Sequence, residues 1–241
     1  MYALKNKVVF NPTSKMAELS VPPPKPARNY LPEWYKKMNA FDTKKPEFNE
    51  YGGVNFNVKM CMPFADSFSA GYIQESWQDI YIESEQLEDG SFNIKYFYPT
   101  KPEIISYRNE VSIPTSDKFY NAEFVFHPAW VPELPSGWSM LYVNPFNRMD
   151  LPFNFLSGIV DADKFKQSEY KSNIPFYINK PFSGLVPKGT PLIQMIPIKR
   201  ESWSSEISSF NENEQAKITE KVRQHFWGGY KKMFWQKKEY S

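Results

Sequence analysis

Hydrophobic and polar residues alternate in short runs through the middle of the chain. The longest run, residues 92–98, follows the turn pair Asp89-Gly90. A period of two puts successive side chains on opposite faces of a strand, so each run predicts a half-buried β-strand. The other runs that we interpret as strands are 7–10, 54–58, 80–82, 123–126 and 139–143, and the apolar run 192–196 predicts a buried strand. Pro, Gly and Asn separate these runs, a pattern typical of an all-β distorted barrel or sandwich.

The two ends of the chain follow different patterns. Residues 21–32 are rich in proline, which favours an extended arm, either a ligand for an SH3-type domain or a segment packed along a protein surface. Residues 32–38 predict a short helix. The capping-box sequence Ser209–Glu212 and the four-residue spacing of Ile218, Val222 and Phe226 predict a C-terminal amphipathic helix. We therefore expect an arm over 1–50, a β core over 51–203 and a helix over 204–241.

Composition narrows the classes of partner. With 29 Lys and Arg against 27 Asp and Glu, the formal charge of +2 gives no electrostatic reason to expect nucleic acid or an anionic membrane. No apolar run approaches the roughly 18 residues of a membrane span, and the first residues do not resemble a signal peptide. Cys61 is the only cysteine, which excludes an internal disulfide and favours a reducing compartment or a virion. The two histidines lack ligand spacing, so no metal site is expected.

Three segments combine glycine with polar residues at turns that lead into strands: 69–73, 156–163 and 187–196. Asp161 and Asp163 would share one face of a strand, or would bind local amides if they lay on a turn. Gln194 is the polar residue of an apolar run, and a buried glutamine needs hydrogen-bond partners. Asp66, Arg148, Asp150, Asp161 and Asp163 form either a polar cluster at one mouth of the fold or a set of turn caps and Arg–Asp pairs.

In this order the three segments resemble the dUTPase and dCTP-deaminase superfamily. Its pattern runs A-G-Y-D-L, then G-V-I-D-x-D-Y-R-G, then G-D-R-I-A-Q-L, and residues 70–72, 158–163 and Gly189 with Ile193 and Gln194 match it. The resemblance implies a β-clip fold, assembly as a trimer, and Asp161 as the general base that activates water. The superfamily's P-R-S-G turn falls near residues 144–150, which keep Arg148 but not Ser-Gly, and its terminal F-G-S-T-G segment is missing.

The whole chain is also similar to an uncharacterised family of about 240 residues found in phages and some bacteria. The segments that suggest this are 32–35, 61–66, 144–153 and 187–194. That resemblance implies a phage origin, and with it a place in the host cytoplasm or the virion.

Two functions follow from these observations. The first is a non-catalytic, β-rich assembly or binding protein, phage-encoded, that forms a homo-oligomer such as a trimer and needs no cofactor. The alternative is a nucleotide hydrolase or nucleotide-binding protein of the dUTPase and dCTP-deaminase type. In the alternative Asp161 is the catalytic base and Mg²⁺ is needed only if the chain is a hydrolase, while the ligand-binding residues are Asp66, Tyr72, Arg148, Asp163 and Gln194. Loss of the phosphate-binding and terminal motifs favours the first function, because triphosphate hydrolysis needs several groups that neutralise charge.

Overall fold

The chain is described by a computed structural model over residues 7–48, 50, 53–108, 116–120, 124–164, 173–225 and 228–241. It separates into two units. The first combines Met1–Ala27 with Gly71–Arg200, and the second combines Arg28–Ala70 with Glu201–Ser241. The boundaries expected from the sequence differ from this division. The residues up to 27 group with the β core, whereas 28–50 group with the C-terminal helices.

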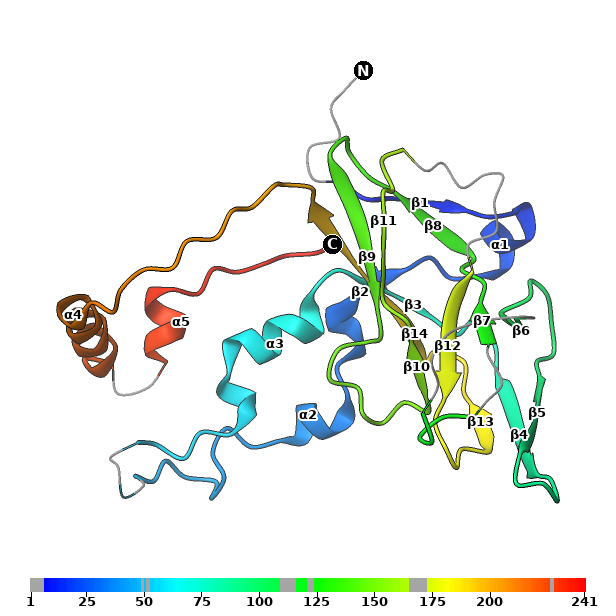
Figure 1. The fold of residues 1–241 in the computed structure, drawn as a ribbon, viewed down its shortest axis with the longest axis horizontal. Coiled ribbons are helices and arrows are strands. Elements are labelled where there is room, and N and C mark those ends of the chain that lie inside the picture. Colours follow the sequence, from blue (N-terminus) through cyan, green and yellow to red (C-terminus); the bar gives the residue numbers. More distant parts are fainter. Residues whose placement is uncertain are drawn as a thin grey trace. The chain divides into compact units, whose positions relative to one another are not determined.

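The first unit is built from antiparallel strands (Figure 1). Its described strands are β1 (Val9–Pro12), β2 (Lys25–Pro26), β3 (Tyr72–Glu75), β4 (Ile80–Gln86), β5 (Phe92–Phe97), β6 (Ile105–Tyr107), β7 (Phe124–Phe126), β8 (Trp130–Glu133), β9 (Trp138–Val143), β10 (Phe153–Phe155), β11 (Gly158–Val160), β12 (Ile174–Ile178), β13 (Gly184–Val186) and β14 (Pro191–Lys199). The helix α1 (Lys15–Ser20) follows β1, and a 3-10 turn at Ala27–Tyr30 follows β2. The prediction of an all-β core is confirmed.

Four sheets arise from these strands. Their orders are β11-β9-β14-β3-β2, β10-β12-β7-β6, β13-β4-β5 and β1-β8. Strand β14 is the longest, at 9 residues, and it pairs with β9 on one side and β3 on the other. None of the sheets formed by the described strands closes on itself, so no barrel is closed in this part of the chain.

Aromatic and aliphatic side chains from three of the four sheets fill one core, and Phe10 and Trp130 of the β1–β8 sheet pack against it. Phe124, Phe126, Met140, Ile193 and Met195 have no exposed surface. Rings meet mostly edge to face or tilted, as in the pair Phe126 and Phe155, whose centroids are 5.7 Å apart. The alternation read from the sequence therefore marks the faces that pack into this core.

The observed elements differ from the predicted ones where local pattern and tertiary contact disagree. Residues 54–58 are not a strand, because Val54 and Phe56 make only isolated bridges to Phe48 and Phe41. Residues Val58–Met60 form a 3-10 turn instead. The arm predicted over 21–32 contributes β2, which pairs with β3, so this part of it is packed along the first unit.

The second unit contains the described helices α2 (Glu33–Lys37), α3 (Met62–Ser69), α4 (Glu212–Arg223) and α5 (Gly229–Met233). Tyr35 of α2 and Phe68 of α3 are buried and lie 4.7 Å apart between ring centroids. The C-terminal helix exists, but its N-cap is Asn211, whose side chain accepts a hydrogen bond from the Glu214 amide. The predicted cap at Ser209 is wrong, and Phe226, the last residue of the predicted four-residue spacing, lies outside the described residues.

Gly71 of the A-G-Y segment has a structural role. Its φ is +68°, and a Cβ built on it would lie 2.0 Å from the carbonyl oxygen of Met195. The backbone of β3 approaches β14 this closely only because no side chain stands between them. Packing alone therefore accounts for the glycine in this motif.

We expect Gly71→Ala to lower the free energy of unfolding by about 2–5 kcal/mol, because the methyl group strains both the left-handed backbone and the β3–β14 contact. Urea unfolding measures this loss. Gly158→Ala is the matched control, since a Cβ there meets nothing within 4 Å and φ is not positive. Equal midpoints for the two variants would contradict the assignment.

Candidate functional site

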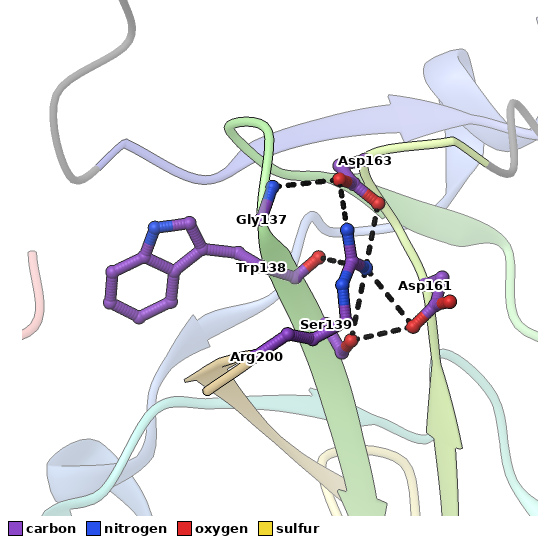
Figure 2. A network of polar contacts seen from close by, with 6 residues as sticks. All are labelled: Gly137, Trp138, Ser139, Asp161, Asp163 and Arg200. Atoms are coloured by element: carbon purple, nitrogen blue, oxygen red, sulfur yellow. Dashed lines mark hydrogen bonds and ion pairs between the residues drawn. The ribbon is translucent and has the colours of Figure 1, made fainter. Parts of the chain in front are cut away.

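A guanidinium group joins the two aspartates that the sequence analysis singled out. Asp161 and Asp163 lie on the turn after β11, and Arg200 follows β14 directly. Since β9 pairs with both β11 and β14, it brings this turn and Arg200 to the same end of the sheet. The turn places the carboxylates around Arg200 rather than along one strand face (Figure 2).

The contacts within this cluster are short and numerous. Arg200 Nη1 lies 2.8 Å from Asp163 Oδ1 and 3.0 Å from Asp161 Oδ1. Its Nη2 donates to Asp163 Oδ2, which also accepts a hydrogen bond from the Gly137 amide at 2.8 Å. The hydroxyl of Ser139, on β9, donates to Asp161 Oδ1 at 2.7 Å. We call Gly137, Ser139, Asp161, Asp163 and Arg200 the Arg200 clamp.

These hydrogen bonds stabilise the ionised carboxylates. The hydrogen bond from Arg200 lowers the pKa of Asp163 to about 2, with the Gly137 amide acting in the same direction. The pKa of Asp161 is also lowered, first by the Ser139 hydroxyl and then by Arg200. Asp163 is 3% exposed at its side chain and Asp161 is 57% exposed. Asp163 is therefore the inner anchor of the clamp and Asp161 the outer one.

A general base at neutral pH needs a pKa near the working pH and an oxygen free to accept a proton. Asp161 departs from the first requirement because its pKa is lowered, and one of its two oxygens, Oδ1, accepts a hydrogen bond from Ser139 and lies 3.0 Å from Arg200. The clamp has the chemistry of an ion pair that holds strands together.

Arg148 and Asp150 form a second ion pair, in the loop between β9 and β10. The guanidinium donates to both carboxylate oxygens at 2.7 Å, a bidentate geometry. This hydrogen bond lowers the pKa of Asp150. The pair lines a cleft of about 690 Å³ together with Lys180 and Lys188. The cleft therefore presents three cations and one carboxylate, so it favours anionic or acidic groups.

Gln194 and Tyr72 lie on the central strands. Gln194, on β14, is 1% exposed, and its Oε1 accepts a hydrogen bond from the Phe146 amide at 2.8 Å. The side chain thereby positions the loop that carries Arg148. Tyr72, on β3, is opposite Met195 in register, and its ring packs edge-on against Phe10 at 5.2 Å.

Asp66 belongs to the second unit and has partners of its own there. It lies on α3, and its carboxylate accepts two hydrogen bonds from Trp235 Nε1 at 2.9 and 3.1 Å. Lys238 Nζ lies 2.6 Å from the same carboxylate. Asp66 therefore anchors the C-terminal segment to α3.

The structure thus brings the predicted residues together in groups rather than in one site. Asp161 and Asp163 share Arg200, and Gln194 supports the loop of Arg148, while Asp66 has separate partners. The sequence analysis missed Arg200 and Ser139. An arginine directly after an apolar strand, combined with two aspartates in an earlier turn, was the available signal.

The residues that the structure describes show neither a metal-binding cluster nor a membrane-spanning helix. They contain no cluster of three or more His, Cys, Asp or Glu side chains placed to hold a metal ion. None of their helices is both long enough and apolar enough to cross a membrane.

Comparison with known proteins gives distant structural neighbours. No protein-family model matches the sequence, and no curated protein matches it. Among solved structures, the dUTPase from phage phi11 of S. aureus is 10% identical with a TM-score of 0.34, over 86% of this chain and 97% of that one. A point mutant of the same enzyme, described as coordinating a structural Mg(II) ion, is 11% identical with a TM-score of 0.33, over 86% and 98%.

A mutant of the Staphylococcus bacteriophage 80alpha dUTPase with dUpNHpp is 11% identical with a TM-score of 0.33, over 86% of this chain and 90% of that one. These neighbours come from the superfamily that the three motifs resemble.

The clamp predicts a loss of stability in acid. The pKa of Asp163 is about 2 in the folded chain and about 3.9 in an unfolded one, so its contribution is complete above about pH 4 and is lost as pH falls towards 2. Unfolding measured across this window should show a shallower decline for Asp163→Asn than for wild type. The matched control is Asp117→Asn, an exposed aspartate. Parallel declines for all three proteins would contradict the clamp.

Two buried glutamines predict opposite responses to the same substitution. Gln74 is fully buried, and neither atom of its amide has a hydrogen-bond partner among the described residues. We expect Gln74→Met to raise the free energy of unfolding by about 1–2 kcal/mol, because an unpaired buried amide is costly. Gln194→Met should lower it by about 1–3 kcal/mol, because the Phe146 amide loses its acceptor. Chemical denaturation decides, and changes of the same sign would refute this interpretation.

Proposed function

We propose that this chain is a non-catalytic assembly protein, phage-encoded, that binds copies of itself in the host cytoplasm or the virion. The observation that carries the proposal is the state of Asp161, the residue expected to act as base. Its carboxylate is engaged by Ser139 and lies 3.0 Å from Arg200.

The chemistry of a base argues against turnover at this position. To take a proton from water, Asp161 would have to compete with a hydroxyl and a guanidinium that stabilise its charged form. Each of these interactions lowers the pKa and so weakens the base. A clamp that joins a turn to the end of β14 supports a structural role instead.

Exposed apolar side chains support self-association. Trp203, Ile207 and Phe210 are 87%, 99% and 77% exposed within one short segment. Apolar side chains that cluster in this way on a surface mark sites of interaction. A homo-oligomer, with a trimer as one form, is the assembly that we propose.

The nucleotide-binding alternative has one observation in its favour, the cationic cleft. Lys180, Lys188 and the Arg148–Asp150 pair surround a volume of about 690 Å³, which is in the size range of small-molecule sites. Phosphate groups would suit these cations. In this alternative the cleft holds a nucleotide, with Mg²⁺ only if hydrolysis follows.

One experiment separates the two functions. The purified chain is incubated with the common deoxynucleoside triphosphates and Mg²⁺, and pyrophosphate and ammonia are measured beside Asp161→Asn. We expect no turnover above that variant, and light scattering at tens of micromolar should give a mass above that of one chain. Turnover that Asp161→Asn abolishes would establish the hydrolase, and a monomer would refute the assembly protein.

A further inference from the structure

Residues 201–211 form an extended segment between β14 and α4. Every residue in it is exposed, and none belongs to a helix or strand. The backbone of 202–210 makes no hydrogen bond to other described residues. The stretch 202–210 leaves its N–H and C=O groups and its apolar side chains to water, and the apolar side chains gain free energy when they are covered. We call residues 201–211 the exposed segment.

A row of exposed apolar side chains crosses the three-stranded sheet of the first unit. Tyr81 of β4 is directly opposite Leu185 of β13 on one side and Phe97 of β5 on the other. Directly opposed residues share a face of the sheet, and these three are 47%, 52% and 55% exposed. Their neighbours Ile80 and Ile82 are buried on the opposite face. We call Tyr81, Phe97 and Leu185 the apolar row.

The apolar row is narrow and has a charged border. Two positions along the strands, Glu83 of β4 is opposite Lys95 of β5 on the same face. Leu185, at the β13 end of the row, also lines the cleft of about 690 Å³ that contains Lys180 and Lys188. A ligand that covers the row would therefore need apolar side chains together with acidic ones that reach these lysines.

The exposed segment has this composition. It carries Glu201 and Glu206 and contains no lysine or arginine. It also carries three apolar side chains, Trp203, Ile207 and Phe210. Like the apolar row, this set consists of two aromatic residues and one aliphatic residue. Charge and apolar character thus match between two surfaces that every copy of the chain presents.

We propose that the exposed segment of one copy binds the apolar row and the adjoining basic cleft of a second copy. This inference rests on the proposed self-association and identifies the surfaces that perform it. Eleven extended residues span at most about 36–40 Å, which suffices to reach a neighbouring chain. Because the two surfaces differ, the contact runs head to tail, so it produces a ring if the rotation closes and a filament if it does not.

Mixing two variants tests the pairing. The first, Trp203→Ser/Ile207→Ser, removes the apolar side chains of the exposed segment. The second, Tyr81→Ser/Leu185→Ser, removes two members of the apolar row. Each should weaken self-association at least tenfold in sedimentation velocity. Mixed in equal amounts, they should form a one-to-one dimer, since each retains the surface that the other lacks. Leu19→Ser, at an exposed apolar residue of α1, is the control and should assemble like wild type.

The outcomes separate the two levels of the proposal. A wild-type chain that sediments as a monomer refutes the self-association itself. A wild-type oligomer that both double variants leave intact refutes only these surfaces. A mixture that stays monomeric, although each variant keeps the circular dichroism spectrum of wild type, refutes the head-to-tail pairing.

Discussion

The ion pairs of Arg200 join the end of the central strand of the largest sheet to a turn that comes nearly 40 residues earlier in the chain. Strand β14 runs through the centre of the largest sheet and ends at Arg200, while Asp161 and Asp163 belong to a turn that follows an edge strand. The buried Asp163 carboxylate and the Gly137 amide place this turn at the start of β9. Without the guanidinium, two carboxylates would lie close together and would lose the cation that stabilises the charge of both.

Alternation along the chain was sufficient to predict the strands that have one buried face. β4 and β5 lie where the period of two indicated them, because each buries alternate side chains, whereas β14 was indicated by an apolar run and buries its first five residues in succession. Residues 54–58 show the same pattern without forming a strand, since a strand needs a partner and the sequence does not encode where that partner lies. The capping box at Ser209 failed for a related reason, because Asn211 offers an equally good cap nearer to the helix.

The candidate site could be predicted by residue type but not by partner. Gln194 was expected to be buried and bonded, and it is, because an apolar run leaves one amide to satisfy. Arg200, which pairs with Asp161, lies 39 positions later in the chain and outside every motif. The two residues come together because β9 pairs with both β11 and β14. Gly71 is explained by the approach of Met195, so a residue shared with an enzyme pattern can be retained for packing.

The hydrogen bonds of Asp66 have a consequence for the end of the chain. Trp235 and Lys238 both bind this carboxylate, so the last turn of α5 is followed by a segment that is held at two points. A C-terminal truncation that removes Trp235 and Lys238 would leave the Asp66 carboxylate on α3 without either of these donors. The C-terminal residues are thus part of the second unit's architecture. A fusion partner should therefore be attached after Ser241 and should not replace Trp235 or Lys238.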